Sequence, residues 1–166
     1  FFARGMAYII SLTSVTITDS VYKKLALTPI YIPFLHKTYI YIPTLVAPII
    51  LLVAIYLLYF TRFGRTIYAI GNNEQSALLM GLSVARTNIA VYAFSGLCSA
   101  LAGIVFSISL LAGYGQFATG MELDAIASVV MGGTSLSGGV GNVFGTLFGV
   151  LINGTIVSII QFNGTL

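Results

Sequence analysis

The chain has 166 residues, of which 58% are hydrophobic and only 7% carry a charged side chain. A soluble domain usually contains about 25% charged residues, so this composition excludes an ordinary soluble protein and indicates one that lies in a membrane. The net charge of +3 includes no basic cluster of the kind that nucleic-acid binding requires, and the single cysteine, Cys98, excludes a disulfide within the chain.

The N-terminal part combines a short apolar segment with a mixed one. Residues 1–12 have the composition of the end of a membrane span, and residues 13–39 contain prolines and no sustained helical period. We expect the second segment to be a loop outside the membrane, on the extracytoplasmic side. His36 in this loop has no acid or cysteine nearby, so we expect no metal site, and the chain as a whole suggests no cofactor. Because the chain starts without Met and stops just after a turn-like Asn163-Gly164-Thr165, we expect a fragment of a longer protein.

Three long uncharged segments follow, at residues 40–60, 88–112 and 142–161. Each is about as long as the roughly 20 residues that a helix needs to cross the apolar part of a bilayer. The basic residues of the two loops are divided three against three between the two sides of this topology. Those of the central loop, residues 61–87, lie closer to the spans, which orients that loop to the cytoplasm. Small residues recur every four positions in the last two segments and predict close helix packing: Ser95, Ser99, Gly103 and Ser107, then Gly141, Gly145 and Gly149.

The central loop contains the signals of a short helix at about residues 72–81. Asn72 can cap its N-terminus with Gln75 as the answering residue of a capping box. Glu74 suits the positive end of the helix dipole, and Gly81 can end the helix in a left-handed conformation. A helix this short is not stable alone in water. It therefore requires the membrane surface or another protein to hold it, unless the stretch is a plain connecting loop.

A second polar stretch interrupts the C-terminal apolar region. Glu122 and Asp124 begin a helix, as complements of its dipole or as a gate or a contact for an extracellular partner. A Gly-rich stretch from Gly132 to Gly141 ends this helix too early for a full span, so we expect a short or broken span at residues 121–138. Broken helices are tolerated where they line a cavity, and they often border transport pathways. The candidate pathway residues are Glu122, Asp124, Gly132, Gly133, Thr134, Ser137 and Gly138.

Residues 63–74 (FGRTIYAIGNNE), followed by Ala77 and residues 81–84 (GLSV), resemble the permease subunits of bacterial ABC importers for simple sugars. That family includes the ribose, xylose and galactofuranose systems. Residues 122–139 (ELDAIASVVMGGTSLSGG) are similar to the family's other recognisable stretch. The finer likeness is to the galactofuranose-type subunit, at residues 1–6, 103–108 and 162–166.

The resemblance implies an all-α, multi-pass transmembrane helical bundle with a short cytoplasmic coupling helix and a short or broken Gly-rich span. It also implies that residues 71–84 form the coupling segment, which docks in a groove on the ATPase subunit. The candidate contacts are Gly71, Asn72, Asn73, Glu74, Ala77, Met80 and Gly81.

By the same resemblance this is a transport subunit of the bacterial inner membrane and not an enzyme. None of the three lysines follows a glycine, so the chain has no P-loop and ATP would be hydrolysed by a partner. The implied partners are ABC ATPase subunits, a second permease of the same or a different kind, a periplasmic sugar-binding protein, a simple sugar and the lipid bilayer. The fragment would be about half of one permease.

Two other classes remain as alternatives. A secondary transporter or channel subunit would use the broken helix near residues 132–141 and would need no ATPase. Ion-coupled pathways are usually marked by ionisable residues within the membrane, yet the three long segments contain no Lys, Arg or His, which counts against proton or sodium coupling. A purely structural subunit would leave the capped helix of the central loop without a purpose.

Overall fold

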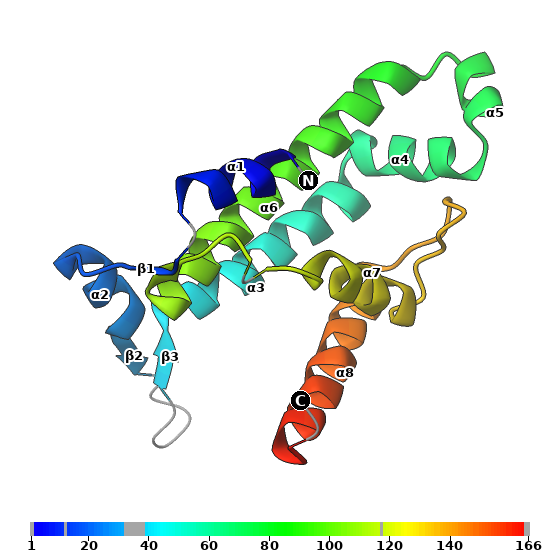
Figure 1. Ribbon diagram of the computed structural model, residues 1–166. Coiled ribbons are helices and arrows are strands. Elements are labelled where there is room, and N and C mark those ends of the chain that lie inside the picture. The colour runs from blue at the N-terminus through cyan, green and yellow to red at the C-terminus, as the bar shows by residue number, and fades with distance from the viewer. Residues whose placement is uncertain (1, 12, 32–38, 117, 165–166) are drawn as a thin grey trace. The chain divides into compact units, whose positions relative to one another are not determined.

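A computed structural model describes residues 2–11, 13–31, 39–116 and 118–164 of the chain. Two compact units are distinguished, one formed by residues 1–53 and 91–117 and the other by residues 54–90 and 118–166 (Figure 1). Each unit therefore combines a segment from the first half of the chain with one from the second half. His36 and the neighbouring residues 32–38 lie outside the described part.

The first unit contains most of the N-terminal segments and the C-terminal part of the long helix α6. Its two small sheets are antiparallel pairs, with Val15 opposite Gly113 in one and Pro29 opposite Tyr41 in the other. The elements are α1 (Phe2–Ile10), β1 (Val15–Thr16), α2 (Ser20–Leu27), β2 (Pro29–Tyr31), β3 (Tyr39–Tyr41), α3 (Ile42–Ile55), α6 (Val84–Leu110) and β4 (Ala112–Gly113).

Residues 13–31 contain more regular structure than the sequence predicted. Asp19 caps α2, because its Oδ1 accepts a hydrogen bond of 2.7 Å from the backbone N–H of Val21. A capped helix of 8 residues is too short to produce the sustained period on which the sequence-based prediction depended. The strands were also missed, since they consist of two or three residues and β1 pairs with β4, a strand distant in the chain.

The second unit contains the central loop and the C-terminal helices. It comprises the π-helical turn η1 (Tyr56–Phe60), α4 (Arg62–Asn72), α5 (Glu74–Leu79), the start of α6, α7 (Met121–Met131) and α8 (Val143–Phe162). Helices α7 and α8 pack closely (Figure 1). A Cβ atom added to Gly149 would lie 2.0 Å from the carbonyl oxygen of Ser128, and one added to Gly145 would lie 2.1 Å from that of Gly132. The prediction of a packing face is confirmed for Gly145 and Gly149. It is wrong for Gly141, which precedes α8 and lies against Thr134.

Three helices in the described part are long and apolar enough to cross a membrane: Ile42–Phe60, Val84–Leu110 and Val143–Phe162. The sequence predicted spans at residues 40–60, 88–112 and 142–161. Helix α7 has 11 residues and rises by about 16 Å, against about 30 Å for the apolar layer of a bilayer, so it is a short segment followed by a break. The predicted all-α class, with several spans and one short Gly-rich segment, is confirmed.

The buried core of the described part is small. Ala26, Ala77 and Val84 are its buried hydrophobic side chains, and most large apolar residues of the spans are exposed. Helices whose surroundings are lipid rather than water have this distribution, because a lipid tail is as favourable a neighbour for leucine as another leucine is. Gly103 of α6 is an example of this exposure, because among the described residues nothing lies within 4 Å of a Cβ added to it. Close packing of the stripe from Ser95 to Ser107 therefore stays a prediction.

Candidate functional site

The short helix of the central loop is α5, and its N-cap is Asn73. The Asn73 backbone is extended at φ −157°, and its side-chain Oδ1 accepts a hydrogen bond of 2.9 Å from the N–H of Ser76. The predicted capping box of Asn72 with Gln75 is therefore wrong by one residue. Asn72 is the last residue of α4, so Asn73 is the first residue that leaves the helical conformation and can act as a cap.

The C-terminal end of α5 is closed as the sequence predicted. Gly81 has φ +79°, a left-handed conformation that glycine adopts without steric cost. Its N–H donates to the carbonyl of Leu78 at 3.0 Å, and the N–H of Leu82 donates to the carbonyl of Ala77 at 3.1 Å. This pair of hydrogen bonds is a Schellman motif. The backbone groups at both ends of α5 therefore have local hydrogen-bond partners. These bonds stabilise a helix of 6 residues, which would not be stable alone in water.

Helix α5 has one buried residue and an exposed apolar surface. Ala77 is 0% exposed, whereas Leu78, Leu79 and Met80 are 62%, 87% and 67% exposed. Among the coupling candidates named from the sequence, Gly71, Asn72, Asn73, Glu74, Met80 and Gly81 are exposed and only Ala77 is inside. Ala77 is therefore the buried residue of the segment, and Leu78, Leu79 and the C-cap Met80 form its exposed apolar surface. Sequence reasoning missed the two leucines because a run of four apolar residues does not reveal which one is buried.

The Gly-rich loop between α7 and α8 is ordered by its own hydrogen bonds. The Ser135 N–H donates to the carbonyl of Val140 at 2.9 Å, and the Gly138 N–H donates to the carbonyl of Ser135 at 3.2 Å. The Ser137 N–H donates to the Ser135 hydroxyl at 3.2 Å. Thr134 is half-buried, while Ser137 and Gly138 are exposed. The loop therefore presents hydroxyl and backbone groups in a fixed conformation.

The pathway candidates do not form one cluster. Glu122 and Asp124 lie in the first turn of α7 and are exposed, whereas Gly132, Gly133, Thr134, Ser137 and Gly138 follow its C-terminal end. Two acids in a first turn suit the helix dipole. This is the first of the roles that the sequence suggested for them. The Asp124 backbone carbonyl also accepts a hydrogen bond of 2.8 Å from the Ser128 hydroxyl, which satisfies this buried side chain within the helix.

The structure brings one coupling candidate, Gly71, against one loop candidate, Gly138. A Cβ added to Gly138 would lie 2.6 Å from the Gly71 carbonyl oxygen, and one added to Gly71 would lie 2.7 Å from the Gly139 nitrogen. The backbones of α4 and the loop therefore touch directly.

Two tyrosines that sequence reasoning did not single out extend this contact. The Tyr68 hydroxyl donates to the carbonyl of Gly141 at 2.9 Å, and the Tyr59 hydroxyl donates to Asn142 Oδ1 at 3.0 Å. Asn142 Oδ1 also accepts from the N–H of Phe144 at 2.9 Å and so caps α8. These partners are 73 and 83 residues apart in the chain, so no local pattern could have indicated them.

Burial raises the pKa of Tyr68 above its ordinary value of 10.0, and the neighbouring Tyr59 adds to the effect. The Tyr68 phenol therefore keeps its proton throughout the physiological range, as a donor to the Gly141 carbonyl must.

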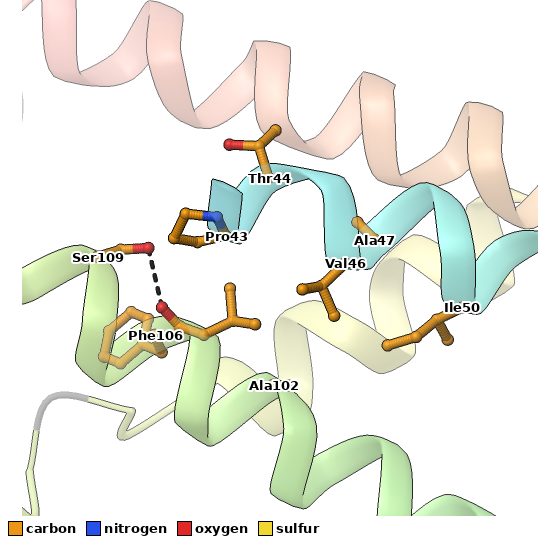
Figure 2. Close-up of a pocket in the computed structure, with 9 residues that line it drawn as sticks. Pro43, Thr44, Val46, Ala47, Ile50, Ala102, Phe106 and Ser109 are labelled. Atoms are coloured by element: carbon orange, nitrogen blue, oxygen red, sulfur yellow. Dashed lines mark hydrogen bonds between the residues drawn. The ribbon is translucent and has the colours of Figure 1, made fainter. Parts of the chain in front are cut away.

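The first unit contains an apolar pocket of about 350 Å³ between α3 and α6 (Figure 2). Its walls are mainly hydrocarbon, including Val46 and Phe106. Thr44 and Ser109 contribute its hydroxyl groups, and the Ser109 hydroxyl donates to the carbonyl of Val105 at 2.9 Å. A sugar site requires several convergent polar groups to replace the hydration of its hydroxyls. This pocket lacks them, so its lining does not fit a sugar.

Comparison with known proteins identifies the class. A family model described as "Branched-chain amino acid transport system / permease component" matches residues 2–165. Because the match covers nearly the whole chain, the protein belongs to this permease family.

The chain is also similar to individual permeases. It is 48% identical over its whole length to the inner membrane ABC transporter permease protein YjfF of Escherichia coli K12, of which it covers 50%. It is 52% identical over 60% of its length to the ribose import permease RbsC of Bacillus subtilis, covering 31% of that protein. It is 47% identical over 66% of its length to the xylose permease XylH of Escherichia coli K12, covering 28%. The chain therefore spans at most about half the length of these relatives. No solved structure matches it.

Proposed function

We propose that the chain is part of the transmembrane permease subunit of an ATP-binding cassette importer for a simple sugar in the bacterial inner membrane. We further propose that residues 71–84 couple it to a separate ATPase subunit. The observation that carries the coupling assignment is the construction of α5, capped at both ends and anchored by Ala77 while Leu79 is 87% exposed. Apolar side chains grouped on the surface of a short polar loop mark a protein contact.

The proposed role is mechanical. ATP binding closes the partner ATPase dimer, and α5 moves with it as a rigid unit. The spans then open the sugar path to the other side of the membrane, and no bond is made or broken in this subunit. Glu74 and Met80 at the two ends of α5, with Leu78 and Leu79 between them, are the proposed docking contacts.

Further protein partners are required to complete a pathway. Only 0–6% of the most apolar window of each candidate span is buried within the described part, which leaves the helix surfaces to lipid or to additional helices. We propose that these are the remaining spans of the same permease and a second permease subunit, with a periplasmic sugar-binding protein delivering the solute.

The proposed solute is a simple sugar. RbsC is a ribose import permease and XylH a xylose transport permease, and the identities of 52% and 47% support a related solute here. The family description names branched-chain amino acids instead, so the uptake experiment below also includes an amino acid. Hydroxyl and backbone groups of the Gly-rich loop, at Thr134, Ser137 and Gly138, are the candidates for hydrogen bonds to sugar hydroxyls, with Glu122 and Asp124 at the other end of α7. Uptake of labelled D-ribose, D-xylose, D-galactofuranose and L-leucine by cells with and without the intact gene would separate these solutes.

The alternative is a secondary transporter or channel subunit that uses the break after α7. Ser137 and Gly138 in the loop of residues 132–141 are exposed, but the family match and the ABC permease relatives favour an ATP-driven system.

Crosslinking tests the coupling assignment. The full-length permease, with Cys98→Ser and a single cysteine replacing Leu79, is placed in inverted vesicles with the ATPase of the same system. Leu79 is the better position than Ala77, because Ala77 is fully buried and a reagent cannot reach it. We expect a crosslink to the ATPase that changes when ATP is added. Free labelling of this cysteine without any crosslink would favour the secondary transporter, and labelling only from the opposite face would overturn the orientation.

A further inference from the structure

The contact between α4 and the Gly-rich loop joins the two segments that a transport cycle would have to move together. Gly71 and Asn72 are the last residues of α4 and directly precede Asn73, the cap of α5. Gly138 and Gly139 lie in the loop that connects α7 to α8. The contact is therefore next to the proposed coupling helix on one side and next to the proposed pathway segment on the other.

Only glycine fits the closest part of this contact. Gly138 and Gly139 have φ of +91° and +73°, and a Cβ on Gly139 would lie 2.9 Å from the Cα atom of Asn72. A Cβ on Gly71 would lie 2.7 Å from the Gly139 nitrogen. Because these neighbours are backbone atoms, which cannot turn aside as a side chain could, an added methyl group would separate the two segments.

Two hydrogen bonds fix the register of the contact. Tyr68 lies one turn before Gly71 in α4 and reaches the carbonyl of Gly141 at 2.9 Å. Tyr59, in the π-helical turn that precedes α4, reaches Asn142 at 3.0 Å, and its ring lies against that of Phe144 with centroids 6.4 Å apart. The loop is thus held at four successive places, from Gly138 and Gly139 to Gly141 and Asn142.

The Gly-rich loop is suited to transmit movement because its hydrogen bonds and packing prevent it from changing shape independently. The Ser135 N–H donates to the carbonyl of Val140, and the loop continues into α8, which packs on α7 through Gly145 and Gly149. Close-packed segments of this kind shift as units between discrete arrangements rather than deforming continuously. A displacement of the end of α4 must either carry the loop with it or break the contact.

We propose that the α4–loop contact of Gly71 with Gly138 and Gly139, fixed by Tyr59 and Tyr68 as positioning residues, transmits movement of the coupling helix α5 to the broken segment between α7 and α8. This inference rests on the proposed coupling function of residues 71–84 and names the internal connection through which it would act. Neither tyrosine has to touch the ATPase or the sugar.

The test uses two single-cysteine reporters in the full-length permease, each with Cys98→Ser, assembled with its ATPase in inverted vesicles. A cysteine replacing Leu79 reports docking by its crosslink to the ATPase. A cysteine replacing Leu136, which is 81% exposed in the loop, reports loop movement by its rate of reaction with a maleimide. With ATP and vanadate we expect the Leu136 rate to change by about fivefold or more, the lower range of measured coupling between sites.

The test variants are Gly71→Ala and Tyr68→Phe, matched by Gly154→Ala and Tyr92→Phe. A Cβ on Gly154 meets nothing within 4 Å among the described residues, and Tyr92 is 79% exposed. In both test variants we expect the Leu79 crosslink to remain while the ATP-dependent change at Leu136 falls below about twofold. The matched controls should keep both signals.

Each outcome decides between the two proposals. A Leu136 response that persists in Gly71→Ala and Tyr68→Phe, or that is missing from the unmodified protein although Leu79 crosslinks, would overturn the transmission role. If the reporter protein without any test substitution gave no crosslink from position 79, the coupling function on which the transmission role rests would be overturned instead. If Gly71→Ala does not assemble, Tyr68→Phe and Tyr59→Phe, which remove only a hydroxyl, carry the comparison.

Discussion

Gly71 and Gly139 meet backbone to backbone, so closely that a Cβ atom on Gly71 would lie 2.7 Å from the Gly139 nitrogen. One residue ends the helix that precedes the candidate coupling segment, and the other belongs to the break between α7 and α8. Two stretches that the sequence indicated separately are thus parts of one contact in the second unit. The stability of that contact can be measured apart from transport.

The first prediction concerns this glycine contact. Gly71→Ala should lower the free energy of unfolding by about 1–3 kcal/mol, the usual cost of overpacking, although alanine favours a helix by up to about 1 kcal/mol. Gly154→Ala in α8 should be neutral or stabilising, since its Cβ enters open space. Denaturant unfolding of the full-length permease in detergent measures both. Equal midpoints for the two variants would contradict the contact.

The second prediction concerns the cap of α5. Asn73→Ala should cost about 1 kcal/mol of local stability, because the Ser76 N–H loses its acceptor. Asn72→Ala should have a smaller effect, since Asn72 is inside α4. Hydrogen exchange of the α5 amides compares them, because local opening reports local stability. Faster exchange in Asn72→Ala than in Asn73→Ala would restore the capping box predicted from sequence.

The third prediction separates anchoring from docking within α5. Ala77→Leu should destabilise the segment by about 1–3 kcal/mol, because there is no space for a larger side chain at a fully buried position. Leu79→Ala should leave the permease as stable as before and weaken its association with the ATPase, since Leu79 is 87% exposed. Unfolding and co-purification with the ATPase are measured for each. If Ala77→Leu instead weakened association and Leu79→Ala instead lowered stability, α5 would present its other face to the ATPase.

The fourth prediction concerns the two ends of the proposed coupling segment. Gly81→Pro should disrupt the end of α5, because proline fixes φ near −65° and Gly81 requires +79°. Glu74→Arg places a cation at the positive end of the helix dipole and reverses the charge offered to a partner. Both variants should insert in the membrane and lose most ATP-driven uptake. Normal uptake by either one would remove that residue from the coupling assignment.

The fifth prediction concerns the pH dependence of the tyrosine contact. Because folding raises the pKa of Tyr68 above 10.0, the folded protein holds this proton more tightly than the unfolded chain does. The corresponding stability is fully present below pH 10 and is lost as the pH rises through the higher folded pKa. Tyr68→Phe should therefore lose less stability between neutral pH and the range above pH 10 than the unmodified protein. Tyr92→Phe is the control, and an unchanged profile in Tyr68→Phe would argue against the buried donor.

Several features could be predicted from the sequence because their causes are local. Long uncharged segments with flanking arginines indicate membrane spans. Gly81 was predicted to end α5 because few other residues adopt a left-handed conformation at low cost, and the spacing of Gly145 and Gly149 indicated a packing face. The cap was misplaced by one residue, since either Asn72 or Asn73 can act as a cap and only the observed end of α4 decides between them.

What the sequence by itself determined about this protein is its class: an all-α membrane protein with a short polar helix and a Gly-rich break, because hydropathy, capping residues and glycine act over a few neighbouring positions. The tertiary structure alone decided which side of α5 is buried at Ala77, and that Tyr59 and Tyr68 reach Asn142 and Gly141. Those contacts join residues 73 and 83 positions apart, and their formation depends on how α4, α7 and α8 pack, which no local pattern records.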